Sequence, residues 1–232
     1  MKVLLTGATG TIGSGILRHL LLNPDITSVV TLTRRPLPPS NPKTTNIVIP
    51  DFQNWDAAIL TSLSDADAMV WAMGTSDTNE DTNYNFILAF QQAFLPVLPT
   101  PRRNRFRYVL TSGLSVEPDQ EKSLWFLDGA RKLKGRTETW SLNFAKEHED
   151  VWQTWIIKPG GVATAETYAV TRMAIGLLIM PTIRDDEVGA FVADLLVHGK
   201  EPEGRILNER MVARGAELLA STYIVLTQKA RD

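Results

Sequence analysis

A glycine-rich run near the start of the chain places the tightest constraint on its fold. The segment Thr6-Gly7-Ala8-Thr9-Gly10-Thr11-Ile12-Gly13 follows the apolar run 2–6 and opens a helical pattern over 12–22. In this context the glycines suit a tight turn, a close approach of backbone to a pyrophosphate, and close packing of helix on strand. Backbone N–H groups at the start of the helix would face phosphate oxygens. The run predicts a dinucleotide-binding loop, with an ordinary glycine turn as the alternative; its candidate contacts are Gly7, Thr9, Gly10, Thr11, Ile12 and Gly13.

The first half of the chain repeats one unit, in which a short β-branched or leucine-rich run is followed by a turn and a helical pattern. This alternation predicts parallel strands joined by crossover helices. Most candidate strands are apolar on both faces, as expected of strands buried between two layers of helices. With 232 residues, 44% of them hydrophobic, the chain suits one large domain better than two. We predict a single α/β domain over 1–232, a Rossmann-like doubly wound parallel sheet, with strands at 2–6, 28–33, 46–49, 68–72, 106–111 and 155–158.

The carboxyl-terminal part, from about 162 to 232, is expected to hold small elements on the substrate side of the sheet. Acidic residues at 185–187 predict a late helix that runs to about 197, and 205–208 is a candidate last strand. Apolar residues within 164–181 suggest an apolar ligand or a partner surface, and core packing explains them equally well. They are Ala165, Ala169, Met173, Ile175, Leu177 and Met180.

The composition argues against several classes of protein. A formal net charge of −2 gives no strong cationic field, so we expect no binding to nucleic acid or to an anionic membrane surface. The chain has no cysteine and its three histidines lack metal-ligand spacing, so we expect no metal site. The first residues run directly into the glycine loop, which leaves no room for a secretory signal, and the apolar stretch 174–180 is too short to span a membrane. We expect a cytoplasmic enzyme; whether it forms a homodimer is left open.

The end of the second candidate strand bears on which dinucleotide is bound. About twenty residues after the glycine loop, an NAD-preferring domain carries an acidic residue that accepts hydrogen bonds from ribose hydroxyls. This chain has Thr33, Arg34 and Arg35 there. A guanidinium suits a 2′-phosphate, with which it forms charge-assisted and often bidentate hydrogen bonds. We therefore favour NADP(H) over NAD(H). Arg35, with Pro36 behind it, is the arginine more readily explained as solvated.

Further short motifs follow the later strands in order. They are Asp51-Phe52, Ala72-Met73-Gly74-Thr75, Leu110-Thr111-Ser112-Gly113, Lys134-Gly135-Arg136-Thr137-Glu138 and Lys158-Pro159-Gly160-Gly161. With the glycine loop, this series resembles the atypical short-chain dehydrogenase/reductases, and among them the NmrA-like and Tat-interacting-protein-like oxidoreductases. The resemblance runs along nearly the whole chain, and its specificity lies in the order of the motifs.

The resemblance implies an NAD(P)-binding oxidoreductase and a role for each motif. It places Asp51 and Phe52 beside the adenine, although each could instead belong to a turn at a strand end. It implies further contacts along the ribose, pyrophosphate and nicotinamide, made by Ala72, Met73, Gly74, Thr111, Lys134, Pro159, Gly160, Gly161 and Val162. The segments 51–52, 72–74 and 159–162 follow strand ends, where ligands of open α/β sheets collect.

The resemblance also implies a catalytic tyrosine that this chain lacks. Members of the family typically place that tyrosine four residues before a lysine, on the same helix face, where it serves as the proton donor. With Lys134 as the lysine, the tyrosine position is Ala130. None of the four tyrosines has a lysine four residues on. The usual acid is therefore absent.

Three other residues are candidate catalytic groups. Lys134 can hold the hydroxyls of the nicotinamide ribose, and Ser112 can exchange a hydrogen bond with a substrate oxygen. Asp128 can supply a proton if burial raises its pKa well above the ordinary value of about 3.9. The alternatives are a surface lysine, a helix cap at Ser112 and a solvated carboxylate at Asp128. Trp125 and Phe126 could wall a substrate pocket, and the polar run 75–83 is either a lid or a capping loop.

These observations leave three hypotheses for function. The first is an NADP(H)-dependent oxidoreductase of a small to medium apolar metabolite, with the proton supplied by Ser112, water or Asp128. The second, favoured by Ala130, is a redox-neutral or redox-coupled isomerase or cyclase of secondary metabolism that uses bound NADP(H). The third is a non-catalytic protein that senses a dinucleotide or binds a partner.

Overall fold

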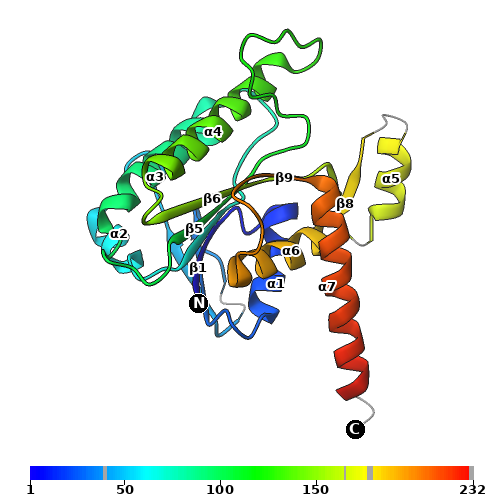
Figure 1. The fold of residues 1–232 in the computed structure, drawn as a ribbon, viewed down its shortest axis with the longest axis horizontal. Coiled ribbons are helices and arrows are strands. Elements are labelled where there is room, and N and C mark those ends of the chain that lie inside the picture. The colour runs from blue at the N-terminus through cyan, green and yellow to red at the C-terminus, as the bar shows by residue number, and fades with distance from the viewer. Residues whose placement is uncertain (39–40, 165, 177–179, 230–232) are drawn as a thin grey trace.

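A seven-stranded parallel sheet forms the centre of the molecule (Figure 1). In the computed structural model the described residues are 1–38, 41–164, 166–176 and 180–229. The strands lie in the order β3-β2-β1-β4-β5-β6-β9, so the order reverses direction between β1 and β4. Their bounds are β1 (Lys2–Thr6), β2 (Ser28–Thr33), β3 (Thr44–Val48), β4 (Ala68–Trp71), β5 (Phe106–Thr111), β6 (Trp152–Lys158) and β9 (Gly204–Leu207).

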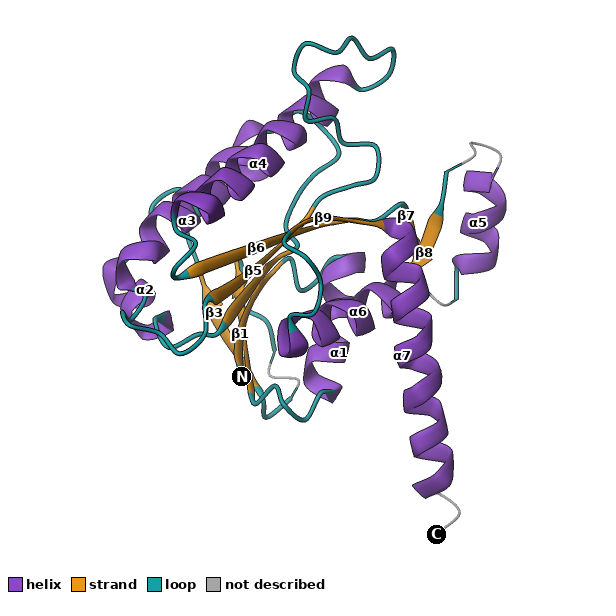
Figure 2. Cartoon of the chain, in the orientation of Figure 1, coloured by secondary structure: helices purple, strands orange, loops and turns teal. Residues whose placement is uncertain are grey.

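Helices cover both faces of this sheet (Figure 2). One face carries α1 (Thr11–Leu22), α6 (Asp185–His198) and α7 (Asn208–Lys229), and α7 extends well beyond the sheet. The other carries α2 (Ala57–Leu63), α3 (Phe86–Phe94) and α4 (Asp128–Glu147). Two short helices flank α3, namely η1 (Asp81–Asn85) and η2 (Leu95–Val97). A small lobe beyond the sheet consists of β7 (Gly161–Ala163), α5 (Tyr168–Gly176) and β8 (Thr182–Arg184).

The strands are apolar throughout because each of their faces packs on helices. In β1, Val3 and Leu5 belong to the core beneath α1 and α6, while Leu4 belongs to the core beneath α2, α3 and α4. All three side chains are fully buried. Full burial of such a side chain contributes about 1.5–3 kcal/mol, so the doubly covered sheet is the main source of stability. The predicted fold class, a single doubly wound α/β domain, is confirmed.

Several element boundaries differ from the prediction. β6 begins at Trp152, whereas the predicted strand begins at residue 155. The prediction was too short because Gln153 and Thr154 interrupt the apolar run of the sequence, although Thr154 is buried in the structure. The three-residue strands β7 and β8 were not predicted, since pairs this short leave no periodic pattern. Residues 113–127 form no helix in the structure, so Ser112 is not a helix cap. No helix in the described part of the chain is both long and apolar enough to cross a membrane.

Candidate active site

The glycine loop joins β1 to α1 and is shaped by its own backbone. Gly7 has a left-handed φ of +68°, and a Cβ there would overlap the carbonyl of Ala72 after β4. A Cβ on Gly13 would overlap the carbonyl of Gly7. The Gly10 N–H donates to the Gly7 carbonyl at 2.9 Å. Close backbone contacts therefore require glycine at Gly7 and Gly13.

The start of α1 is open to a ligand. Gly10 occupies the N-cap position, and no side chain in the described part of the chain caps the helix. Thr9, Gly10 and Thr11 are exposed. The unpaired N–H groups of the first turn and the helix dipole favour an anion at this end. This geometry fits the pyrophosphate of a dinucleotide.

Two arginines follow β2, next to the glycine loop. The side chains of Arg34 and Arg35 are exposed, and within the described ranges neither guanidinium has a hydrogen-bond or ion-pair partner. The chain then turns back, and the Leu37 N–H donates to Asn46 Oδ1 at 3.0 Å. A surface cleft beside the loop is lined in part by Thr9, Pro36 and Leu37. The arginines are therefore free to bind an anion close to this cleft.

Asp51 and Phe52 have structural roles in the turn after β3 and in the core. The Asp51 carboxylate accepts hydrogen bonds from the Asn54 amide at 2.6 Å and from the Gln53 N–H at 2.8 Å, and these bonds lower its pKa. The ring of Phe52 is buried and contacts the ring of Trp71 edge-on. Its side chain thus belongs to the core, so only its backbone could face an adenine.

A narrow cavity of about 20 Å³ lies at the carboxyl ends of β4 and β5. This is room for about one water molecule or one substrate oxygen. Five of the residues predicted from separate motifs line it together, namely Met73, Gly74, Thr111, Ser112 and Lys134. Ile87, Leu110, Asn83 and Thr137 complete the lining.

Lys134 brings a half-buried ammonium group to this cavity. A Cβ placed on Gly74 would lie 3.8 Å from Lys134 Nζ, so the two residues are close neighbours. Burial lowers the pKa of Lys134, and the negative charge of Asp77 partly opposes that effect. The ammonium has no hydrogen-bond or ion-pair partner among the residues that the structure describes. A cation that is half-buried and unpaired can donate to a ligand.

Ser112 is tied to a buried carboxylate that the sequence analysis did not single out. Its hydroxyl donates to Glu138 Oε1 at 2.6 Å, and Glu138 is fully buried. Lys158 Nζ donates to the same oxygen at 2.7 Å, and Arg205 Nε donates to Glu138 Oε2 at 2.6 Å. Glu138 lies four residues after Lys134 on α4. Both belong to the motif 134–138, for which the sequence predicted a functional role for Lys134 only.

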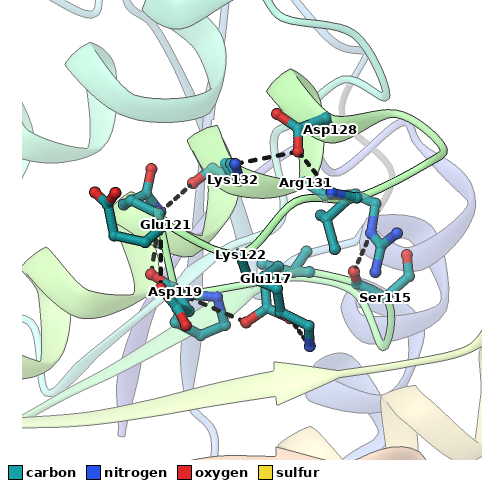
Figure 3. Close-up of polar contacts among 12 residues, drawn as sticks. Ser115, Glu117, Asp119, Glu121, Lys122, Asp128, Arg131 and Lys132 are labelled. Atoms are coloured by element: carbon teal, nitrogen blue, oxygen red, sulfur yellow. Dashed lines mark hydrogen bonds and ion pairs between the residues drawn. The ribbon is translucent and has the colours of Figure 1, made fainter.

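The structure argues against Asp128 as a proton donor. Its carboxylate accepts a hydrogen bond from the Lys132 ammonium at 3.1 Å and another from the Leu124 N–H at 3.1 Å. The hydrogen bond with Lys132 is the main reason that its pKa is lowered, whereas a neutral acid needs a raised pKa. Asp128 belongs to a network that ties the loop before α4 to the first turn of the helix (Figure 3).

The neighbouring aromatic residues do not line this cavity. Trp125 is 95% exposed and Phe126 is 56% exposed, and neither lines the cavity at Ser112. The polar run 75–83 is held down by Asn83, which is buried. Asn83 Oδ1 accepts from the Thr75 N–H at 3.0 Å, and its amide donates to the Asp77 carbonyl at 3.0 Å. In the structure this run is therefore anchored beside the cavity by Asn83.

The backbone of the segment after β6 is hydrogen-bonded to neighbouring segments. The Gly160 N–H donates to Asn208 Oδ1 at 2.8 Å, and the Gly161 N–H donates to the Pro181 carbonyl at 2.9 Å. The carbonyl of Pro159 accepts from the Leu114 N–H at 2.8 Å. Val162 packs against the core beneath α1 and α6. The two N–H groups and the Pro159 carbonyl are already hydrogen-bonded within the protein. A cofactor could therefore contact this segment mainly by van der Waals packing.

The apolar residues expected on the substrate side are only partly described. Met173 and Met180 are exposed, as is Val170 on α5. Ala165 and Leu177 lie outside the described residues. The exposed side chains are compatible with an apolar ligand or partner.

Comparisons with known proteins identify the fold. No family model matches the chain, and no curated protein matches it. A reductase domain from Penicillium fellutanum matches with a TM-score of 0.65 and 19% identity, over 89% of this chain and 66% of the other. A short-chain dehydrogenase/reductase from Saccharomyces cerevisiae matches with 0.63 and 17%, over 89% and 94%. Uronate dehydrogenase from Agrobacterium tumefaciens matches with 0.62 and 15%, over 89% and 76%.

The fold is thus that of short-chain dehydrogenase/reductase structures. One of the similar structures is a uronate dehydrogenase mutant bound to NAD. At these identities the likeness concerns the fold, and the atypical NmrA-like subfamily stays a prediction.

Proposed function

We propose that this chain binds NADP(H) and acts as an oxidoreductase on a small to medium apolar metabolite. The observation that carries the proposal is the Lys134 ammonium, which has no hydrogen-bond or ion-pair partner among the described residues and shares a cavity with Ser112 at the carboxyl ends of β4 and β5. The open start of α1 supplies the pyrophosphate site, and Arg34 supplies a free cation for the 2′-phosphate. When bound, the cofactor supplies or accepts a hydride. The role of Lys134 is then to hold ribose or substrate oxygens next to Ser112.

A second function is favoured by Ala130. This residue is buried one turn before Lys134 on α4, in the place where the resemblance expects a tyrosine. Without that acid, an isomerisation or cyclisation that uses bound NADP(H) without net consumption fits the same site.

Incubation of the protein with NADPH or NADP⁺ and an apolar metabolite extract separates these functions. The absorbance of reduced nicotinamide and the product profile are followed together. A change in cofactor redox state supports the oxidoreductase, whereas product formation without a net change supports the isomerase. If neither occurs, the site binds without catalysis and both proposals are wrong.

Two substitutions test the cofactor site. Arg34→Asp, after β2, tests the preference for NADPH, and Gly10→Val tests the glycine loop. We expect NADPH to bind more tightly than NADH, and Arg34→Asp to lower the ratio of affinities about 10–100-fold, because a charge-assisted contact becomes repulsive. Arg103→Asp is the matched control, since Arg103 is also exposed but precedes β5 at the opposite end of the sheet. Gly10→Val should abolish binding of both cofactors. Equal NADPH and NADH affinities in the parent would remove the 2′-phosphate assignment, and retained binding in Gly10→Val would remove the loop assignment.

A further inference from the structure

We propose that Glu138 fixes the Ser112 hydroxyl as a hydrogen-bond acceptor toward the cavity, so that the site selects a hydroxyl group over a carbonyl group. The inference deepens the proposed function and rests on it for the identity of the site. It names the chemical class of ligand and a positioning residue, Glu138, that acts through Ser112.

The first step is the state of the Glu138 carboxylate. Both of its oxygens accept from cations, Oε1 from the ammonium of Lys158 and Oε2 from the guanidinium of Arg205. The side chains of Glu138 and Lys158 are 0% and 6% exposed. A carboxylate whose two oxygens accept hydrogen bonds from two cations acts there as an acceptor only.

The second step is the direction of the Ser112 hydroxyl. A serine has one hydrogen to donate, and two lone pairs that accept. At 2.6 Å from Glu138 Oε1, that hydrogen is committed to the carboxylate. The oxygen of Ser112 therefore meets the cavity with lone pairs.

The third step is the second polar group that lines the cavity. Lys134 presents an ammonium, which only donates. A ligand oxygen between Ser112 and Lys134 must donate to the first and accept from the second. A hydroxyl group does both, whereas a carbonyl oxygen can only accept and would leave Ser112 facing another acceptor.

Two hydroxyl sources fit this chemistry, a substrate alcohol and a ribose hydroxyl of the cofactor. The experiment measures the affinities of matched alcohol and ketone probes, cyclohexanol against cyclohexanone and 1-phenylethanol against acetophenone, by NMR titration with and without saturating NADP⁺. We expect each alcohol to bind the parent at least about 10-fold more tightly than its ketone, because an unmatched acceptor pair is costly. A preference that persists with NADP⁺ assigns the hydroxyl to the substrate, and one that NADP⁺ removes assigns it to the ribose.

The positioning role is tested by releasing Ser112. In Glu138→Met/Lys158→Met the buried pair is replaced by apolar side chains of similar volume, which proteins often tolerate, and Arg205 can turn to solvent. The Ser112 hydroxyl is then free to donate, so we expect the alcohol-to-ketone ratio to fall to within about threefold of unity. Ser112→Ala, which leaves the ion pair intact, should give the same loss. A merely structural role would weaken both probes alike and leave the ratio unchanged.

Ser141→Ala is the control, since Ser141 is buried on the same helix but its hydroxyl has no hydrogen-bond partner in the described structure. It should keep the parental ratio. Equal affinities in the parent, or a ratio that survives both variants, overturn the inference while NADPH binding stands. Alcohol selectivity without any NADPH or NADH binding overturns the proposed function alone. If no probe binds, the cavity is not a hydroxyl site and the inference is wrong.

Discussion

Lys134 combines a cost to stability with a gain in binding. Its ammonium is half-buried without a described partner, and burial lowers its pKa. We expect Lys134→Met to weaken NADPH about 10–100-fold, since hydrogen bonds to charged groups are worth about 1.5–3 kcal/mol. The melting temperature should be unchanged or higher, because the buried charge is lost. Lys132→Met, which removes an ion-paired lysine from the same helix, should leave NADPH affinity unchanged in a fluorescence titration.

The same residue predicts a pH dependence. Only the protonated ammonium donates hydrogen bonds to a ligand. Because its pKa is below the ordinary lysine value, NADPH affinity should fall as the pH rises through a range where other lysines remain charged. Lys134→Met should show no such fall over that range. An identical pH profile in parent and variant would exclude Lys134 as a cofactor ligand.

At the level of single residues, the sequence predicted the groups that lie on motifs and missed those that depend on distant partners. Ser112 and Lys134 line one cavity, as the order of motifs suggested. Glu138 stood in a quoted motif, but its partners are 20 and 67 residues further along the chain. Such partners cannot be read from spacing. Asp128 was a candidate acid because the sequence does not show that its side chain is exposed and ion-paired with Lys132.

At the level of elements, close helix contact constrains the face of the sheet that carries α1. A Cβ on Gly15 of α1 would lie 2.6 Å from the Asp185 carbonyl of α6, and a Cβ on Gly189 would overlap the carbonyl of Gly15. Gly15→Ala should therefore lower the free energy of unfolding by about 1–3 kcal/mol in urea titrations, because backbone must move. Gly129→Ala on α4 is the control, since its added methyl meets only the side chain of Thr78 at 3.2 Å. Equal stabilities of these variants would mean that α1 and α6 can separate freely.

Elements were predictable where burial is continuous. β2 and β5 have the predicted bounds, because their interior residues are apolar, β-branched or buried, apart from the half-buried Arg107 of β5. The late helix also agrees, as α6 begins at Asp185 and ends at His198. The pair β7 and β8 depends on contacts between segments about twenty residues apart, which have no local pattern.

At the level of the whole molecule, two cores share one sheet. Trp155 packs in the core beneath α1 and α6, whereas Trp71 and Trp152 pack in the core beneath α2, α3 and α4. Trp152 and Trp155 lie on the same strand, β6, so neither core can be lost without disrupting hydrogen bonds that support the other. The two faces should therefore unfold together in one cooperative transition.

This coupling can be tested by perturbing one face and observing the other. In Trp155→Phe the tryptophan of the α1 face is removed, so changes in core fluorescence report the opposite face. Adding Gly15→Ala should lower the fluorescence midpoint by roughly 2–10 °C, since a loss of about 1–3 kcal/mol shifts a domain of this size by that amount. The midpoint of far-ultraviolet circular dichroism should move equally. A fluorescence midpoint that stays in place while the dichroism midpoint moves would show that the two faces unfold separately.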